Sequence, residues 1–310
     1  MSNFKHLTGG VIAAALVGLT VAPALHAQLP DHLRSYQLSS PRASGDVVGP
    51  MFNGWIKNKD GSVTMIFGFV NKNQEEIVDV PLGENNKIEP AQFDGVQPTH
   101  FPVYSRGGFV GLQERGVFAV TVPADMAGTE VVWTLNHAGH SYSIPGRAVS
   151  PAYEMSSDPA AMGSLNPAIR FDRNGAESTD RVGIYAPLVN AKVGTPVTLT
   201  AYAQDRGDRR GYDVATPFFP LGTEWIMHQG PVGATPEFDN PKVTGQDRGE
   251  ADKQGMSGSG DWTETRTNVT FSEPGDYVIR LRVDNFTAPD SQFDNQCCWS
   301  NAYVPVKVSN

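Results

Sequence analysis

The sequence predicts an all-β protein made of two antiparallel β-sandwich domains, on three observations. The chain has 310 residues, which suits two domains of ordinary size. Only 18% of the residues are charged, and 32 Gly and 23 Pro are present, a composition that favours short strands and many turns over long helices. Short runs of Val, Ile, Phe, Trp and Thr, each closed by Gly or Pro, recur along most of the chain.

Residues 1–27 have the pattern of a secretory signal peptide. Lys5 precedes an apolar core from Val11 to Val21, and small residues lead to a cleavage site after Ala27, with Ala24 as the alternative. The apolar core is short for a membrane span, although a retained anchor is the other interpretation, and no second apolar segment follows. We therefore expect a secreted or periplasmic protein with no membrane span after cleavage.

The first β-sandwich domain is expected at residues 51–149, after an extended, proline-punctuated leader at 28–50. In GWIKNKDGSVTMIFGFVNKN, two β-rich runs flank Lys59-Asp60-Gly61, where the Asp-Gly pair supplies the positive φ of a tight hairpin. The same pattern continues in IVDVPLG, GVFAVTVP, EVVWTLN and HSYSIPG.

A linker is expected at residues 150–179, which are rich in Ser, Pro and Ala and lose the alternation. A second β pattern then begins at about residue 180. In GTPVTLTAYAQD, Val197, Leu199 and Ala201 share one face, as in a half-buried strand. Further strands are expected in TEWIMHQGP, on both sides of Glu273-Pro274-Gly275, and in AYVPVKV near the C-terminus.

The stretches GTPVTLTAYAQD, TEWIMHQGP, NVTFSEPGDYVIRLRVDN and YVPVKV resemble the successive strands of a polycystic-kidney-disease-like (PKD-like) domain of exported bacterial proteins. The resemblance covers residues 180–310 and implies an immunoglobulin-like sandwich with Tyr277, Ile279, Leu281 and Val283 in its core. A polar insertion at residues 239–265 departs from the family pattern. The pattern describes a fold and implies no activity. The first domain resembles exported bacterial proteins of unassigned role.

Two long acidic loops, at residues 203–213 and 284–301, are expected to emerge at the same end of this sandwich. Carboxylates and carbonyl groups gathered there would suit Ca²⁺, which prefers six to eight oxygen ligands. Turn formation and solvation are the alternative roles of these residues. The candidate calcium ligands are Asp205, Asp208, Asp284, Asp290 and Asp294.

The same loops carry aromatic and amide side chains that suit stacking on sugar rings or anchoring of a protein partner. A carbohydrate or a cell-surface protein is therefore the expected ligand. The alternative for the tryptophan is packing inside the sandwich, because tryptophan is usually well buried. The candidate ligand-binding residues are Trp299, Phe293, Phe286, Tyr212 and Asn295.

Cys297 and Cys298 are adjacent and are the two cysteines of the chain. Export favours a vicinal disulfide between them, which would stiffen the second loop. Binding of a soft metal and bridging between molecules are the alternatives, although no further ligand stands at CxxC spacing.

The leading hypothesis is an exported, non-catalytic binding protein. A net charge of −9 without a basic run excludes nucleic-acid binding. Catalytic motifs such as GxSxG and HExxH are absent from the sequence. The alternative is an accessory subunit or metal-dependent enzyme with copper or zinc near His137 and His140, with His100 as a third ligand. A self-assembling structural protein with open edge strands is a further alternative.

Overall fold

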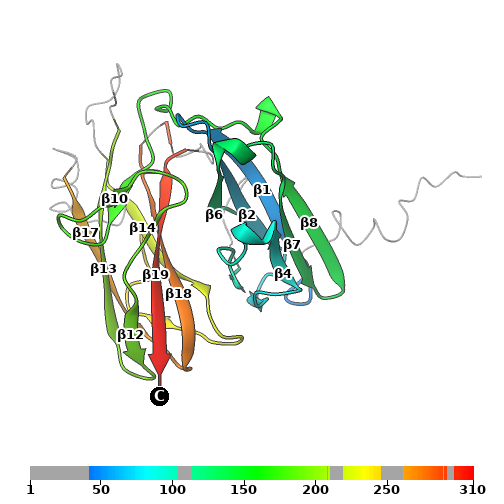
Figure 1. Cartoon of the computed structure of the whole chain (residues 1–310). Coiled ribbons are helices and arrows are strands. Elements are labelled where there is room, and N and C mark those ends of the chain that lie inside the picture. The colour runs from blue at the N-terminus through cyan, green and yellow to red at the C-terminus, as the bar shows by residue number, and fades with distance from the viewer. Residues whose placement is uncertain are drawn as a thin grey trace, which may run out of the picture. The chain divides into compact units, whose positions relative to one another are not determined.

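Strands make up almost all of the regular structure (Figure 1). The computed structural model describes residues 42–103, 113–207, 209, 219–245, 261–288, 290–291 and 297–310. Within these ranges the other regular elements are the short 3-10 turns η1 (Ala91–Phe93), η3 (Ala124–Met126) and η4 (Pro151–Tyr153). The predicted all-β class is confirmed.

The first sandwich has two facing three-stranded sheets. One contains β1 (Val48–Lys57), β2 (Val63–Asn71) and β6 (Gln113–Val122), and the other contains β4 (Asn86–Glu89), β7 (Val131–His137) and β8 (His140–Gly146). A separate pair joins β3 (Val78–Asp79) to β5 (His100–Phe101). The predicted hairpin around Asp60-Gly61 is confirmed, because β1 and β2 pair on either side of it and Gly61 has φ +87°. The core is aromatic, with the Phe118 ring 5.3 Å from Phe67 and 5.0 Å from Trp133.

The second sandwich is immunoglobulin-like. Its smaller sheet has the order β10 (Glu177–Ser178), β9 (Ala168–Arg170), β13 (Val197–Gln204), β17 (Thr263–Thr270) and β15 (Glu237–Phe238). Its larger sheet has the order β11 (Ile184–Tyr185), β19 (Trp299–Ser309), β18 (Gly275–Asp284), β14 (Gly222–Gln229) and β16 (Lys242–Val243). Strand β12 (Val189–Lys192) runs parallel to the end of β19.

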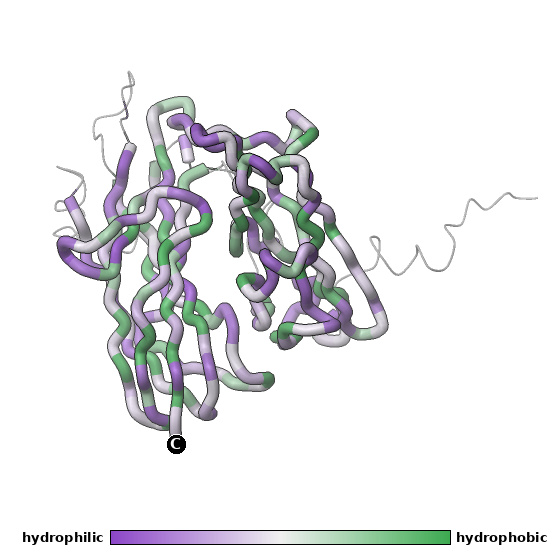
Figure 2. The backbone as a smooth tube through the Cα atoms, in the orientation of Figure 1, coloured by the Kyte–Doolittle hydropathy of each residue, from purple (hydrophilic) through white to green (hydrophobic). Residues whose placement is uncertain are grey.

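Alternation along the strands builds the core between these two sheets. Figure 2 shows this alternation as successive hydrophobic and hydrophilic residues along the strands of the second sandwich. Six of the seven predicted inward residues of β13 and β18 are buried in one cluster, which confirms the predicted faces: Leu199, Ala201, Tyr277, Ile279, Leu281 and Val283. The third position predicted for the β13 face, Val197, packs at the edge of this cluster.

The leader, the linker and the polar insertion, which were expected to lack strands, contain strands where they are described. The signal peptide and residues 28–41 of the leader lie outside the described residues, whereas β1 begins within the leader at Val48. The expected linker contains β9 and β10, and β9 pairs with β13. The polar insertion contains β16, which pairs with β14.

The outward face of β18 and β19 is buried against β6 of the first sandwich. Arg280 and Arg282 are 2% and 4% exposed, and both donate to the buried carboxylate of Glu114 in β6, at 3.3 and 2.6 Å. Asn301 and Tyr303 donate to the carbonyl oxygens of Gly116 and Val117, at 2.7 and 3.0 Å. Side chains of the second sandwich thus satisfy the backbone of β6, and the two sandwiches belong to one compact unit.

Over the described ranges, none of the helical turns has the length and apolar character required to cross a membrane.

Candidate functional site

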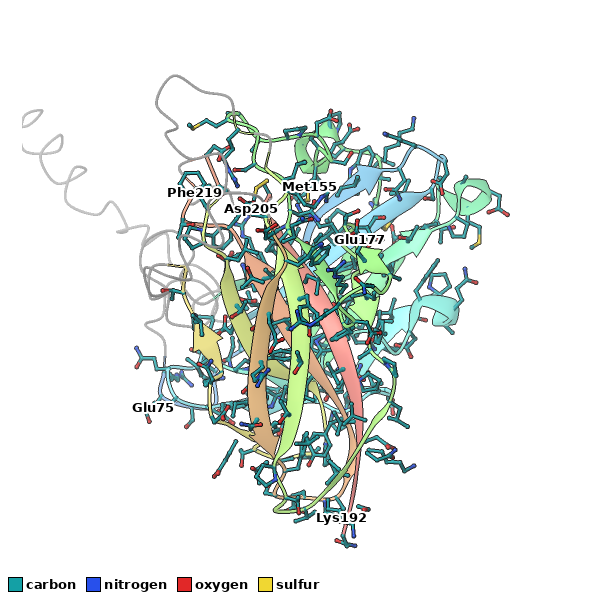
Figure 3. All side chains as sticks on the ribbon, turned by 90° about the vertical axis from the view of Figure 1, so that its left-hand side faces the viewer. Glu75, Met155, Glu177, Lys192, Asp205 and Phe219 are labelled. Atoms are coloured by element: carbon teal, nitrogen blue, oxygen red, sulfur yellow. A yellow bond between two sulfur atoms is a disulfide. The ribbon has the colours of Figure 1, made fainter. Side chains whose placement is uncertain are left out.

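The candidate site is the end of the second sandwich where the two acidic loops begin. Figure 3 shows Asp205 and Phe219 at this end, with Lys192 at the opposite end. We call it the loop end; its described residues are Asp205–Gly207, Arg209, Phe219–Leu221, Asp284–Ala288, Asp290–Ser291 and Cys297–Trp299. Five of the predicted site residues lie outside the described ranges: Asp208, Tyr212, Phe293, Asp294 and Asn295.

Asp205 is the hub that holds the first loop to the second. Its side chain is 2% exposed and pairs with the fully buried guanidinium of Arg209. Its carboxylate also accepts from the backbone N–H of Phe219 at 2.9 Å and from Nδ2 of Asn285 at 3.1 Å. Asn285 in turn donates to the carbonyl oxygen of Leu165 at 3.0 Å. One buried carboxylate therefore links the two loops, and through Asn285 it also joins the segment that precedes β9.

Asp290 forms a second hub on that same segment. Its carboxylate accepts from the hydroxyl of Ser164 at 2.5 Å and from the backbone N–H groups of Met162 and Ser164 at 2.9 and 3.1 Å. Burial raises the pKa of Asp290, but these hydrogen bonds and the Arg209 charge outweigh it, so the pKa lies below its ordinary value. Arg209 Nε also donates to the Ser164 hydroxyl, at 2.7 Å, which joins the two hubs.

These contacts bear on the calcium prediction. The carboxylates of Asp205 and Asp290 already accept hydrogen bonds from protein groups: a guanidinium, a hydroxyl and N–H groups. Across the described residues, no three His, Cys, Asp or Glu side chains gather as a metal site would require. Because Asp208 and Asp294 are outside these residues, calcium binding stays a prediction.

Cys297 and Cys298 form a vicinal disulfide at the base of the second loop. Cys298 is fully buried and has φ +81°, a conformation that residues other than glycine rarely adopt. Its carbonyl oxygen accepts from the N–H of Asn285 at 3.2 Å, and the Cys297 sulfur lies 3.7 Å from the Ser164 carbonyl oxygen. The disulfide thus contacts Asn285 and Ser164, the residues that also hydrogen-bond to Asp205 and Asp290.

Trp299 lies beneath the loop end instead of on its surface. It is 2% exposed, and its Nε1 donates to the Gly116 carbonyl oxygen of β6 at 3.3 Å. The guanidinium groups of Arg181 and Arg282 lie over its ring, at 4.7 and 5.6 Å from the centroid. The indole therefore packs between the two sandwiches, against Ile56, Ile66 and Ala119 of the first, and not inside the second sandwich as the alternative expected. Phe286 is half-buried, with Arg282 5.6 Å from its ring.

A cleft of about 310 Å³, which we call the β14–β18 cleft, opens beside Phe286. Its volume is at the low end of the range for small-molecule sites. Asp284 and Phe286 come from the end of β18 and the loop after it, and Glu224 and Lys242 come from β14 and β16. Glu224 and Lys242 pair at 3.4 Å. The cleft therefore combines a half-buried aromatic ring with carboxylate, ammonium and threonine groups.

The three histidines of the predicted metal site lie on two different parts of the first sandwich. His137 and His140 are cross-strand partners in the β7–β8 hairpin, whose turn residues Ala138 and Gly139 have positive φ. His140 stacks on Tyr142, with the ring centroids 6.0 Å apart. His100 lies on β5, where its Nδ1 is 2.7 Å from a carboxylate oxygen of Asp79.

The fold defines an all-β protein of two antiparallel β-sandwiches, of which the second is immunoglobulin-like. Its sequence matches no protein-family model and no curated protein. Among solved structures, it is similar to a CARDB domain from Pyrococcus furiosus, with 13% identity and a TM-score of 0.24 over 46% of this chain and 93% of that chain. It is also similar to domains 4 and 5 of the S-layer protein SbsC, with 10% identity and a TM-score of 0.25 over 59% of this chain and 66% of that chain. A third similar structure is the D00-D0 domain of intimin, with 12% identity and a TM-score of 0.25 over 85% of this chain and all of that chain. Such low scores carry no information about function.

Proposed function

We propose that this chain is an exported, non-catalytic binding protein of the cell surface or periplasm that recognises a carbohydrate through the β14–β18 cleft. The signal-peptide pattern of residues 1–27 supports export. The proposal includes the PKD-like assignment of the second sandwich, which the sequence resemblance of residues 180–310 supports.

The observation that carries the proposal is the cleft itself, built on an end of the sandwich that is fixed by side-chain contacts. Buried hydrogen bonds at Asp205 and Asp290, together with the vicinal disulfide, hold the loop segments that flank it. A binding site on a fixed scaffold loses less conformational entropy when a ligand binds. The buried carboxylates of the loop end hold these segments in place, and the groups that line the cleft are the ones that would contact a ligand.

The chemistry of the lining suits a sugar. Carboxylates such as Glu224 and Asp284 accept hydrogen bonds from hydroxyl groups, and Lys242 donates to ring and hydroxyl oxygens. Phe286 supplies an apolar edge for the C–H face of a pyranose ring. The backbone at Gly222 and Gly245 has no side chain to narrow the cleft.

A glycan-array experiment tests this proposal on the mature chain. We expect the wild type to retain a defined subset of glycans, and E224Q/D284N to lose at least tenfold in affinity for them, because hydrogen bonds to charged acceptors contribute about 1.5–3 kcal/mol each. Asp276→Asn is the matched control, because Asp276 lies at the other end of β18 with an 85% exposed side chain. No glycan retained, or equal retention by E224Q/D284N, would contradict the proposal.

A further inference from the structure

A second cleft, of about 250 Å³, lies beside the vicinal disulfide, and we call it the β1–β2 hairpin cleft. Its wall includes Cys297 of the disulfide and Asn58, Lys59 and Thr64 of the first sandwich. The remaining lining comes from residues 56, 156–158, 165–166, 179–181 and 206. None of these residues lines the β14–β18 cleft.

Two cations of this cleft have no ion pair within the described part of the chain. Arg206 Nη1 donates to the carbonyl oxygens of Asn166 and Thr179, at 3.3 and 3.5 Å. These two contacts anchor one corner of the guanidinium, and Nε and Nη2 have no acceptor among the described residues. Lys59 stands at the turn of the β1–β2 hairpin and is exposed. Because these oxygens belong to neutral carbonyl groups, they provide no counter-ion, and the guanidinium can pair with an anionic ligand.

The charges of the described lining residues sum to a net positive value, in a chain of net charge −9. Arg181 adds a third cation, and its guanidinium contacts the Trp299 carbonyl oxygen and ring. Asp180 accepts from the N–H of Gly183 at 2.9 Å and is partly satisfied. Among the described residues that line the cleft, three cations therefore face two carboxylates, Asp158 and Asp180.

Hydroxyl-recognising groups accompany these cations. Ser156 accepts from the N–H of Asp158 at 2.9 Å and retains its own O–H to donate. The Asp158 carboxylate has no partner among the described side chains and can accept from a ligand hydroxyl. A bare inorganic anion would leave this carboxylate opposed to a like charge, whereas a hydroxylated ligand would satisfy it.

We infer that the β1–β2 hairpin cleft binds a small hydroxylated carboxylate, of the class of an acidic monosaccharide, with Arg206 and Lys59 holding the carboxylate and Asp158 and Ser156 holding hydroxyl groups. The site is separate from the one in the proposed function, and it needs residues of both sandwiches. The volume admits about one sugar unit, since it lies just below the usual range of about 300–1,000 Å³ for larger ligands.

Isothermal titration of the mature chain with glucuronate, glucose and sulfate tests the inference. We expect saturable 1:1 binding of glucuronate that weakens with added salt, at least tenfold weaker binding of glucose, and at least tenfold weaker competition by sulfate. Arg206→Gln should reduce glucuronate affinity at least tenfold without lowering the melting temperature, because glutamine can still donate to Asn166 or Thr179. Lys59→Gln, at an exposed turn, should reduce it several-fold.

Arg173→Gln is the control for loss of one positive charge, because Arg173 is exposed and pairs with Glu264 outside the cleft. It should bind glucuronate as the wild type does. No binding of glucuronate, equal binding of glucose, equal competition by sulfate, or unchanged affinity in Arg206→Gln would each overturn the inference. If the glycan-array result fails while glucuronate binding depends on Arg206, only the proposed carbohydrate site at the β14–β18 cleft is lost.

Discussion

The indole of Trp299 occupies the space beside Gly116 where any other residue would carry a β-carbon. Trp299 begins β19, and Gly116 lies in β6 at φ +60°, where the pairing of β2 with β6 is interrupted. The N–H of Gly116 donates to Asn53 Oδ1 at 2.8 Å, and its carbonyl oxygen accepts from Asn301 and Trp299. The contact of the two sandwiches thus depends on a position that only glycine suits.

Gly116→Ala should therefore destabilise the protein by about 2–4 kcal/mol, from overpacking against the indole and from the positive φ. Chemical denaturation measures this change. Gly128→Ala is the matched control, because no atom lies within 4 Å of a β-carbon there and its φ is not positive. Equal stabilities of the two variants would contradict the described contact.

The buried Glu114 carboxylate should be essential to the same interface. Glu114→Gln removes the buried carboxylate that pairs with both Arg280 and Arg282, and we expect a loss of about 3 kcal/mol or more in the free energy of unfolding. Glu130→Gln removes an exposed pair with Arg147 and should cost less than about 1 kcal/mol. A loss at Glu114 no larger than that at Glu130 would show that the arginines are solvated.

Protonation of His228 should destabilise the protein in acid. Burial and the charges of Arg280 and His100 lower the pKa of His228 from 6.5 to about 3. The hydrogen bond to the Val96 carbonyl oxygen raises this pKa, but by less than the other effects lower it. The Tyr303 ring also packs against it, with the centroids 5.2 Å apart. Because the folded pKa is below the unfolded one, the stability contribution is complete above pH 6.5 and falls by about 1.4 kcal/mol per pH unit as pH drops toward 3.

His228→Gln provides the comparison, since glutamine can donate to Val96 but does not titrate. The free energy of unfolding, measured from pH 4.5 to 7.5, should fall more steeply in the wild type than in this variant below pH 6.5. Parallel curves would mean that the imidazole reaches solvent in the folded state.

The vicinal disulfide should hold Cys298 at its positive φ. We expect C297S/C298S to melt at a lower temperature than the wild type, and C297S/C298G to be more stable than C297S/C298S by about 1–2 kcal/mol, because glycine adopts positive φ without a steric cost. Thermal melts with and without a dithiol reductant measure this, with the reductant affecting only the wild type. A glycine variant no more stable than the serine variant would argue against this role.

Alternation in the sequence predicts the core of the second sandwich, because inward positions such as Leu281 repeat every second residue. The same alternation marks Arg280 and Arg282 as solvent-facing, yet both are buried. Their burial depends on Glu114, more than 160 residues earlier in the chain, and no local pattern encodes such a contact.

The candidate site shows the same limit. The adjacent cysteines correctly predict a vicinal disulfide, because the pairing of neighbouring residues is a local feature of the sequence. The partners of Asp290 could not be predicted, because Ser164 lies in a segment without strand alternation, 126 residues away. Trp299 was expected either on the loop surface or inside the second sandwich, and the structure instead buries it against Gly116 of the first sandwich, a contact that no local pattern indicates.

Hydrogen exchange of the mature chain with and without a glycan retained on the array tests the central claim most directly, because it locates the bound sugar on the chain. The account predicts slower exchange at the lining of the β14–β18 cleft, in residues 222–224, 242–245 and 284–287, and unchanged exchange at residues 273–276 at the other end of β18. Protection confined to the first sandwich, or none at these three segments, would contradict it.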